Sequence, residues 1–385
     1  MSDQKTAPGA KRVLIATASV GAGHNAAARA VAAGLEALPN PPEVEILDVL
    51  DLAPWLFRAY YAKGFAFVVT RFPIFYGMGY HISNHPQGPR LGLMERRRLW
   101  HERRAMKKFR EHMRDYRTDL VVHTHFLAPP ILSHMSVRGL FDATQFVAVT
   151  DHDPHRFWFA GAIKRWFLPS ETGVEKLAGW GIDRDAITVS GMPIHPKWAE
   201  PPDRAKILAE WRLPADKPVV LLSGGTDFTC GPVVKTARRI LQLCPEISLV
   251  VLGGRNKKLL ARLGKLAAEV DGLFPVSFTD KVDELVKISA MMITKPGGIT
   301  TAECIAAGVP MILQKPVPGQ EADNAKYFRK NGAAIVTRRY SAAPREVRKL
   351  LDDPEALKRL SDNARGLFRP GTDTVVEAIA AELEL

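Results

Sequence analysis

The sequence predicts an α/β protein made of two doubly wound, mostly parallel sheets, and three observations lead to this prediction. A chain of 385 residues is too long for one ordinary hydrophobic core. Short apolar runs rich in β-branched residues alternate with helical patterns along its length, as in parallel sheets covered by helices. A proline-rich break at 195–202 and 214–218 divides the alternation into two series. We therefore expect domains at 1–198 and 199–385, with the last helices packing back toward the first domain.

Each series contains its own set of candidate strands. In the first half they are 13–17, 44–47, 120–123, 146–150, 165–168 and 187–190. In the second half they are 219–223, 248–253, 275–278, 291–294, 310–313 and 334–337. Helical patterns such as 26–38 and 233–243 lie between them. Ligands of open α/β sheets bind beyond the carboxyl ends of the strands, so two such domains facing each other would form a central cleft there.

The first loop of interest joins strand 13–17 to a helix and reads Ser-Val-Gly-Ala-Gly-His over residues 19–24. It lacks the full glycine fingerprint of dinucleotide-binding folds, which disfavours an NAD-dependent oxidoreductase. At the start of a helix the dipole disfavours a charged imidazole. His24 is therefore expected to be neutral near pH 7 and able to accept a proton. The alternative is a histidine that only caps the helix.

A second loop lies in residues 292–303, which read Met-Ile-Thr-Lys-Pro-Gly-Gly-Ile-Thr-Thr-Ala-Glu. A strand runs into Gly297 and Gly298, and a helix is expected to start near Thr300. Glycines allow a close backbone approach, and the new helix offers free N–H groups to a phosphate. Glu303, about one turn further, would reach a ribose diol. The alternative is a turn in which Glu303 completes a capping box with Thr300.

A third loop, residues 316–324, follows the next strand and should lie at the same edge of the sheet. It carries Gln320, Glu321 and Asn324, whose side chains suit the recognition of hydroxyl groups by directed hydrogen bonds. A diphosphate site beside a hydroxyl-reading site is what a nucleotide sugar requires. The alternative for Asn324 is that it caps a helix.

Positive charge is concentrated in one stretch. The chain carries a formal net charge of +12, and residues 90–117 hold eleven Lys or Arg against four acids. Aromatic residues precede this stretch between 52 and 80, and the combination suits a lipid headgroup surface. The docking residues that we expect on an anionic membrane are Arg96, Arg97, Arg103 and Lys107. The alternatives are buried aromatics beside a solvated basic face, and a nucleic-acid-binding protein, for which no recognised fold surrounds the stretch.

The cysteine pattern and the apolar segments of the sequence predict the cellular location of the protein. Cys230, Cys244 and Cys304 show no paired spacing and are expected as small buried residues in a reducing compartment. The first residues carry no apolar signal segment, and no run of apolar residues is long enough to span a bilayer. We expect a cytoplasmic protein, peripheral on the inner face of the cell membrane.

Several short motifs occur in a characteristic order. They are Gly21-Ala22-Gly23-His24, Val149-Thr150-Asp151, His155 with Trp158, Pro169-Ser170-Glu171, Gly191-Met192-Pro193, the Lys-Pro-Gly-Gly-Ile-Thr of 295–300 and the Pro-Val-Pro-Gly-Gln-Glu of 316–321. Spread over roughly residues 11–368, this set resembles the monogalactosyldiacylglycerol synthase and processive diacylglycerol glucosyltransferase family. More distantly, the chain is similar to the GlcNAc transferase of lipid II synthesis. The resemblance implies a GT-B fold of two Rossmann-like domains, a UDP-sugar donor, inversion at the anomeric carbon and no metal cofactor.

The resemblance also implies roles for individual residues. His24 matches the candidate base that deprotonates the acceptor hydroxyl. Glu303 matches the ribose ligand, and Phe278 and Thr279 match the strand end against which uracil packs. The complete donor-binding set is Gly23, Ser223, Gly224, Gly225, Phe278, Thr279, Gly297, Gly298, Thr300, Glu303, Gln320, Glu321 and Asn324. One departure is Met291, which stands where similar sequences usually carry an acid and indicates different local packing.

Asp151-His152-Asp153 has the spacing of the Asp-x-Asp metal clamp found in the other major glycosyltransferase fold. We reject that interpretation, because a helix dipole and backbone N–H groups already neutralise the phosphates and leave a cation little to do. No metal is therefore expected. The acceptor side is assigned to Asp151, His155 and Trp158, with ordinary packing as the alternative for Trp158.

The favoured function is an inverting glycosyltransferase that moves a hexose from a UDP-sugar to the hydroxyl of diacylglycerol at the membrane surface, without nucleic acid as a partner. Another lipid or a polyprenyl-linked acceptor stays open at this stage. So does the choice of glucose, galactose or another sugar as the donor sugar, since glucose and galactose differ only in the orientation of one hydroxyl.

Overall fold

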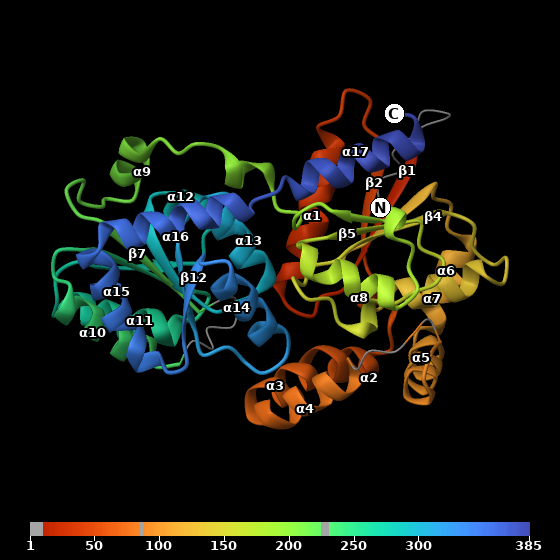
Figure 1. The fold of residues 1–385 in the computed structure, drawn as a ribbon, viewed down its shortest axis with the longest axis horizontal. Coiled ribbons are helices and arrows are strands. Elements are labelled where there is room, and N and C mark those ends of the chain that lie inside the picture. The colour runs from red at the N-terminus through yellow and green to blue at the C-terminus, as the bar shows by residue number, and fades with distance from the viewer. Residues whose placement is uncertain (1–10, 85–87, 89, 225–230) are drawn as a thin grey trace. The chain divides into compact units, whose positions relative to one another are not determined.

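The structure, a computed structural model, describes residues 11–84, 88, 90–224 and 231–385. The chain folds into two compact units (Figure 1). One unit contains the chain up to Pro196 together with Arg369–Leu385, and the other is Lys197–Phe368. The chain thus enters the second unit close to the expected boundary at 198, and it returns to the first unit near its end.

The first unit is built on a six-stranded parallel sheet with the order β2-β1-β3-β4-β5-β6. The strands are β1 Arg12–Thr17, β2 Glu43–Asp48, β3 Leu120–His123, β4 Thr144–Ala148, β5 Arg165–Leu168 and β6 Ile187–Val189. All six expected strands of this half are confirmed. The direction of winding reverses between β1 and β3, so the loops that follow these strands lie at a switch point, where ligands of such sheets bind.

The central strand β1 is buried on both faces. Val13 and Ile15 point into one cluster of the core, and Leu14 and Ala16 point into another on the opposite face. This arrangement explains why the strand reads as a continuous apolar run rather than as an alternating one. Helices therefore cover both faces.

The helices of the first unit are α1 Ala22–Glu36, α2 Trp55–Arg58, α3 Phe65–Arg71, α4 Pro73–Ser83, α5 Leu93–Ala105, α6 Lys107–Asp115, α7 Pro129–Ser136, α8 Val174–Gly179 and α17 Gly371–Leu383. Short helical turns are η1 Val49–Leu52, η2 Ala59–Gly64, η3 Arg156–Trp158, η4 Glu171–Gly173 and η5 Arg184–Ala186. Figure 1 shows α2, α3 and α4 outside the sheet, in the connection between β2 and β3. These three helices contain most of the aromatic residues found between positions 52 and 80.

The last helix, α17, belongs to the first unit and packs against α1. A Cβ added at Gly34 of α1 would lie 2.8 Å from a methyl group of Val376 and 2.9 Å from that of Thr372. The glycine therefore permits the close approach of the two helices. Thr372 also donates from its hydroxyl to the carbonyl of Ile194 at 2.6 Å.

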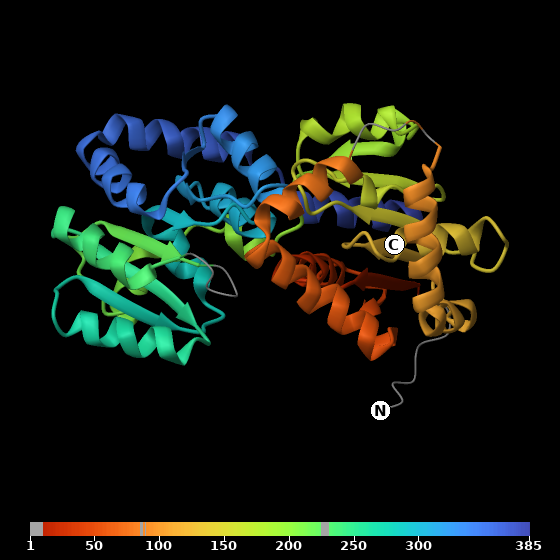
Figure 2. The same ribbon diagram turned by 90° about the horizontal axis from the view of Figure 1, so that it is seen from below.

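The second unit repeats the plan with a sheet in the order β12-β11-β10-β7-β8-β9. Its strands are β7 Val219–Ser223, β8 Ser248–Gly254, β9 Leu273–Ser277, β10 Ser289–Thr294, β11 Met311–Gln314 and β12 Ala334–Thr337. Its helical segments are η6 Pro196–Ala199, α9 Arg204–Glu210, α10 Val233–Leu243, α11 Lys257–Ala267, α12 Val282–Lys287, α13 Gly298–Ala306, α14 Gln320–Lys330, η7 Tyr340–Ala342, α15 Ala343–Asp352 and α16 Pro354–Leu367. The strands and helices can be followed from below in Figure 2. The switch point lies between β7 and β10.

Two helices begin earlier than the sequence predicted. The helix expected over 26–38 starts at Ala22, because Gly21 makes the turn with a φ of 94°. The helix expected near Thr300 starts at Gly298, with Gly297 as its N-cap residue. In both places we assigned the glycines to a loop, whereas they form the first turn of the helix or its cap.

Candidate active site

His24 lies in the first turn of α1, at the switch point of the first unit. Its Nδ1 is 2.9 Å from the backbone carbonyl oxygen of Thr124, which follows β3, and 2.9 Å from the hydroxyl oxygen of Thr150, which follows β4. A carbonyl oxygen can only accept, so Nδ1 carries the proton. Nε2 is then left with its lone pair, which is the tautomer that a general base requires.

The His24 ring is neutral at physiological pH. Burial lowers its pKa to about 4, although the hydrogen bond to the Thr124 carbonyl raises it. The neutral ring matches the expectation, but the main cause is burial rather than the helix dipole that we invoked from sequence. The role of His24 as the base stays a prediction.

A second histidine lies against the first. The rings of His125 and His24 meet edge to face, with centroids 4.5 Å apart. His125 is buried, and its Nδ1 accepts from the N–H of Leu127 at 3.0 Å. Burial, followed by the nearby His24, holds the pKa of His125 well below its usual range. Sequence reasoning missed His125, although its place directly after a strand at the switch point would have marked it.

The residues assigned to the acceptor side come from the acceptor loop, which we define as residues 151–158. The indole N–H of Trp158 donates to Asp151 at 2.9 Å, and both side chains are buried. The Trp158 ring lies 6.4 Å from that of His24 between centroids. Asp153 forms an ion pair with Lys176 of α8. Among the residues that the structure describes, no group of three or more side chains is arranged to hold a metal ion.

His155 and Arg156 fasten this loop to neighbouring helices. His155 Nδ1 accepts from the N–H of Phe157 at 3.1 Å, while Nε2 lies 3.1 Å from the carbonyl oxygen of Tyr80 and 3.1 Å from the hydroxyl oxygen of Ser83. Both ring nitrogens are therefore bonded within the protein. Arg156 is fully buried. No sequence pattern marks it, because its partner lies far away in the chain.

The glycine loop of the second unit leads from β10 into α13. Gly297 caps the helix and Gly298 begins it, so the first N–H groups of α13 point out of this loop. A Cβ added at Gly297 would meet no atom within 4 Å, so the side of the loop beyond this residue is open. Thr300 lies in the first turn. This arrangement suits a phosphate group.

Glu303 lies in the second turn of α13 and is partly exposed. Burial raises the pKa of its carboxyl group to about 8; the charge of Lys197 lowers it and that of Asp283 raises it. At pH 7 the carboxyl group is therefore mainly protonated in the structure described here. The capping box with Thr300 is not formed, because Gly297 is the N-cap residue.

The two donor loops are tied to each other. The buried Asn324 donates from its amide to the carbonyl of Pro296 at 3.0 Å. Glu321 accepts from the N–H of Val317 at 2.9 Å and lies 3.6 Å from the Lys295 ammonium group. The two segments that we paired from sequence thus lie side by side at one edge of the sheet.

Helix α14 begins at Gln320, with Gly319 as its N-cap residue at a φ of 99°. Asn324 therefore lies beyond the first turn and does not cap the helix. Gln320 is at the start of the helix, beside the loop that Glu321 stabilises. The assignment of both side chains to the donor sugar stays a prediction.

The remaining donor residues lie at strand ends. Phe278 follows β9 with 58% of its surface exposed, and the Arg255 guanidinium lies over its ring at 3.9 Å from the centroid. Thr279 accepts from the N–H of Lys281 at 3.0 Å. An exposed ring after a strand is suited to stacking with a base.

The other glycine positions lie at or near the same kind of edge. Ser223 ends β7 and is buried, and Gly224 follows it. Gly225 and Cys230 lie outside the described residues. Gly23 lies in the first turn of α1, directly before His24.

The basic stretch forms two helices, α5 and α6, which are separated at the buried Met106. Arg98 turns inward and pairs with Glu102 at 2.8 Å. The four predicted docking residues show different degrees of exposure: Arg96, Arg97 and Lys107 are exposed, and Arg103 is half-buried. The stretch is thus partly structural and partly a free basic surface.

Many apolar side chains of α2 to α4 are exposed. They form what we call the apolar face of α2–α4: Trp55, Leu56, Tyr60, Phe67, Val68, Phe72, Ile74, Phe75, Met78 and Ile82. Phe57 and Tyr61 instead pack against the core. The alternative that the aromatics are simply core therefore holds for only part of the segment. No helix in the described part of the chain is both long and apolar enough to cross a membrane.

Two family models match this chain. Residues 24–194 match monogalactosyldiacylglycerol (MGDG) synthase, and residues 203–367 match glycosyl transferases group 1. Two curated relatives are both named processive diacylglycerol beta-glucosyltransferase. The protein of Bacillus subtilis (strain 168) is 30% identical over 282 residues, which is 72% of this chain and 73% of the relative. That of Bacillus pumilus (strain SAFR-032) is 34% identical over 242 residues, which is 62% of this chain and 63% of the relative.

Solved structures resemble the chain over nearly its whole length. Acinetobacter baumannii MurG superposes with a TM-score of 0.59 at 17% identity, covering 96% of this chain and 99% of MurG. The Staphylococcus aureus MnaA–UDP co-structure gives a TM-score of 0.60 at 14% identity, covering 97% of each chain. At these identities the likeness concerns the fold. It confirms the predicted GT-B plan of two Rossmann-like domains.

Proposed function

The chain belongs to the monogalactosyldiacylglycerol synthase family of glycosyltransferases, and from this premise we propose that it transfers glucose from UDP-glucose to the free hydroxyl of diacylglycerol. The names of the two Bacillus relatives support glucose and a β-linked product. In UDP-glucose the sugar is α-linked, so a β-linked product requires inversion at the anomeric carbon. A single displacement with one general base accomplishes this.

The observation that carries the proposal is the state of His24. A neutral ring with Nδ1–H directed at the Thr124 carbonyl presents the Nε2 lone pair to a hydroxyl group. In the proposed step Nε2 takes the proton of the lipid hydroxyl, and the oxygen forms a bond to the anomeric carbon. The bond from that carbon to the β-phosphate oxygen breaks, and its electron pair leaves with UDP.

Backbone N–H groups at the start of α13 support the leaving group in this proposal. They offer partial positive charge where the diphosphate gains negative charge, which is the task that a metal performs in other glycosyltransferases. We therefore propose that no divalent metal is needed. Glu303 is proposed to accept from the ribose hydroxyls once it has lost its proton.

The lipid acceptor requires the enzyme to work at a membrane. We propose that the apolar face of α2–α4 enters the headgroup region and that Arg96, Arg97, Arg103 and Lys107 attract anionic lipid. The enzyme would then be a peripheral protein on the cytoplasmic face of the membrane. The exposure of ten large apolar side chains in one excursion supports this, since soluble surfaces rarely gather so many.

The test is incubation with a panel of UDP-sugars and diacylglycerol vesicles, followed by mass analysis of the lipid fraction. We expect a hexose added to diacylglycerol, with UDP-glucose as the preferred donor and a β-linkage by NMR. Product from UDP-galactose alone would correct the sugar, and transfer only to a polyprenyl phosphate would correct the acceptor. An α-linked product would overturn the single displacement at His24.

A further inference from the structure

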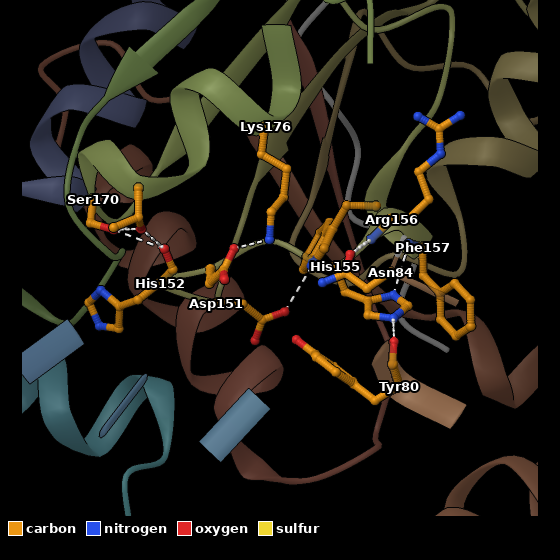
Figure 3. Close-up of polar contacts among 12 residues, drawn as sticks. Tyr80, Asn84, Asp151, His152, His155, Arg156, Phe157, Ser170 and Lys176 are labelled. Carbon is orange, nitrogen blue, oxygen red and sulfur yellow. Dashed lines mark hydrogen bonds and ion pairs between the residues drawn. The ribbon is translucent and has the colours of Figure 1, made fainter. Parts of the chain in front are cut away.

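The acceptor loop is bonded to the same helix that presents much of the apolar face of α2–α4. Helix α4 exposes Ile74, Phe75, Met78 and Ile82, whose spacing places them on one side of the helix. Tyr80 lies on the opposite side and is buried. At the end of α4, Tyr80 and Asn84 approach His155 and Arg156 of the loop (Figure 3).

The protonation of His155 follows from its partners. The N–H of Phe157 must donate, so Nδ1 is the acceptor and Nε2 carries the proton. That proton is directed at the carbonyl of Tyr80, with the hydroxyl of Ser83 also within 3.1 Å. Burial lowers the pKa of His155 to about 4, so the ring is neutral at pH 7. His155 thus joins the turn of the loop to the last turn of α4.

Arg156 makes the next connections along the loop. Its backbone N–H donates to the Asn84 side chain at 2.9 Å, and its Nε donates to Glu95 of α5 at 2.9 Å. The guanidinium is fully buried and packs over the Phe159 ring at 3.9 Å. Breaking such a pair leaves a buried charge without its partner, so separating Arg156 from Glu95 is costly in free energy.

The far end of the loop reaches the candidate base. Trp158 lies beside His24 and is fixed by its hydrogen bond to Asp151. A displacement of α4 would therefore act on the loop that places Trp158 beside His24. This path consists of hydrogen-bonded and packed groups throughout, all within the first unit.

We infer that His155 is a positioning residue, which couples the seating of α4 on a lipid surface to the arrangement of the acceptor loop beside His24. Both ring nitrogens of His155 are bonded within the protein, so in this inference His155 acts through the loop. The inference rests on the proposed function and adds a consequence to it. The lipid surface holds the acceptor, and its contact with α4 also determines the conformation of the acceptor loop. Activity on an acceptor in a membrane should then exceed activity on a dissolved one.

Two substitutions separate the two bonds of His155. Asparagine places an oxygen near the position of Nδ1 and is a favoured N-cap residue, so His155→Asn keeps the bond to the Phe157 N–H and loses the link to α4. Glutamine reaches further, so His155→Gln retains a donor toward the Tyr80 carbonyl. A third variant, Asn84→Ala, removes the neighbouring link. Its matched control is Asn331→Ala. Both variants remove an asparagine side chain at the residue that follows a helix, Asn84 after α4 and Asn331 after α14 of the second unit.

The measurement compares turnover of long-chain diacylglycerol in vesicles with turnover of a short-chain diacylglycerol below its aggregation concentration. In the unmodified protein we expect a higher kcat on vesicles. In His155→Asn and Asn84→Ala the ratio of the two rates should fall by roughly three- to tenfold, the range for the loss of one neutral hydrogen bond. His155→Gln should restore most of the ratio, and Asn331→Ala should not change it.

A second readout does not depend on catalysis. Hydrogen exchange of the amides in 151–158 should slow when phosphatidylglycerol-containing vesicles are added to the unmodified protein, and should not slow in His155→Asn. An unchanged vesicle-to-solution ratio in His155→Asn, or equal loss in His155→Asn and His155→Gln, would overturn the inference. If neither acceptor is glycosylated but vesicles still slow the exchange only in the unmodified protein, the proposed acceptor is wrong and the coupling stands.

Discussion

The candidate base site of the first unit and the candidate donor site of the second unit occupy equivalent positions, at the switch point of a parallel sheet, but they are made differently. The base site is assembled from side chains that follow β1, β3 and β4, and each is fixed by contacts with the others. The donor site is made mainly of backbone at the start of one helix, braced by Asn324 and Glu321. A site made of side chains should therefore be the more sensitive to single substitutions.

Burial acts on both sites and favours the neutral form of the central group in each. It lowers the pKa of His24 to about 4 and raises that of Glu303 to about 8. The consequences are opposite. His24 is already in the form that accepts a proton, whereas the carboxylate that we propose for the ribose hydroxyls forms only when Glu303 loses its proton.

The largest effect is expected at His24. We predict that His24→Ala lowers kcat by roughly 10²–10⁴-fold, which is what a general base contributes. UDP affinity, measured by calorimetry, should change little, because the predicted UDP ligands other than Gly23 lie in the second unit. A variant with near-normal turnover would show that another group takes the proton.

The next effect concerns the lipid side of the first unit. Reversing the charge at Arg96, Arg97, Arg103 and Lys107 should weaken binding to anionic vesicles by roughly 10²–10³-fold at low salt, because each basic residue near such a surface contributes about 1 kcal/mol. Cosedimentation measures this binding, and raised salt should weaken that of the parent protein. The matched control reverses four exposed basic residues of the second unit, Arg262, Lys265, Arg329 and Lys330. Equal loss in the control would mean that net charge alone governs vesicle binding.

A smaller effect is expected at the donor site. Glu303→Ala should weaken UDP binding by about 1.5–3 kcal/mol, the worth of hydrogen bonds to a charged group. The variant should lose as much affinity for uridine as for UDP, because the carboxylate is proposed to contact only the ribose. Its affinity for pyrophosphate should not change. Unchanged UDP affinity would assign Glu303 a purely structural role.

The pH dependence of UDP binding sharpens this prediction. In the proposed binding mode the carboxyl group of Glu303 binds the ribose as the anion, so UDP binding should strengthen as the pH rises from 7 toward 9 and should level off above about 8. Below that pKa the affinity should fall by up to about tenfold per pH unit. Glu303→Gln has no such proton to lose, and its UDP affinity should be flat over this range. If the UDP affinity of the parent protein is equally independent of pH, the ionisation of Glu303 does not control UDP binding.

The smallest expected effect is that of metal removal. Turnover should be unchanged in excess EDTA, because in the proposed mechanism the start of α13 supplies the positive end of a dipole to the diphosphate. Activity that is lost in EDTA and restored by Mg²⁺ or Mn²⁺ would reverse the prediction and reopen the role of Asp151 and Asp153.

The difference between the two sites also explains what the sequence could predict. The donor loops are contiguous segments, so Gly297, Glu303 and Gln320 could be assigned from local patterns and from the family resemblance. The strands were predicted for a similar reason, since runs such as those of β1 and β7 are buried on both faces and read as continuous apolar stretches. The early starts of α1 and α13 were missed, because a glycine can end a loop or begin a helix.

The contacts of the first-unit site are not local. Thr124 bonds to His24 across a separation of 100 residues, and Arg156 bonds to Glu95 across 61. Neither pair is visible in a local pattern. The break between α5 and α6 at Met106 was missed as well, because the basic composition continues through it. Such features depend on tertiary packing, which a single sequence does not display.

The return of α17 to the first unit affects the order in which the protein is completed during synthesis. Val375, Val376, Ile379 and Leu383 belong to the same core cluster as Val13 and Ile15. The ribosome must therefore finish residues 197–368 before the first unit receives its last helix. Domains generally fold in the order in which they are translated. Here the second unit can fold completely while one face of the N-terminal sheet still lacks the α17 helix that packs on it. The helix that bears His24 is thus synthesised before the second unit, but α17 can pack against it only after the second unit has been synthesised.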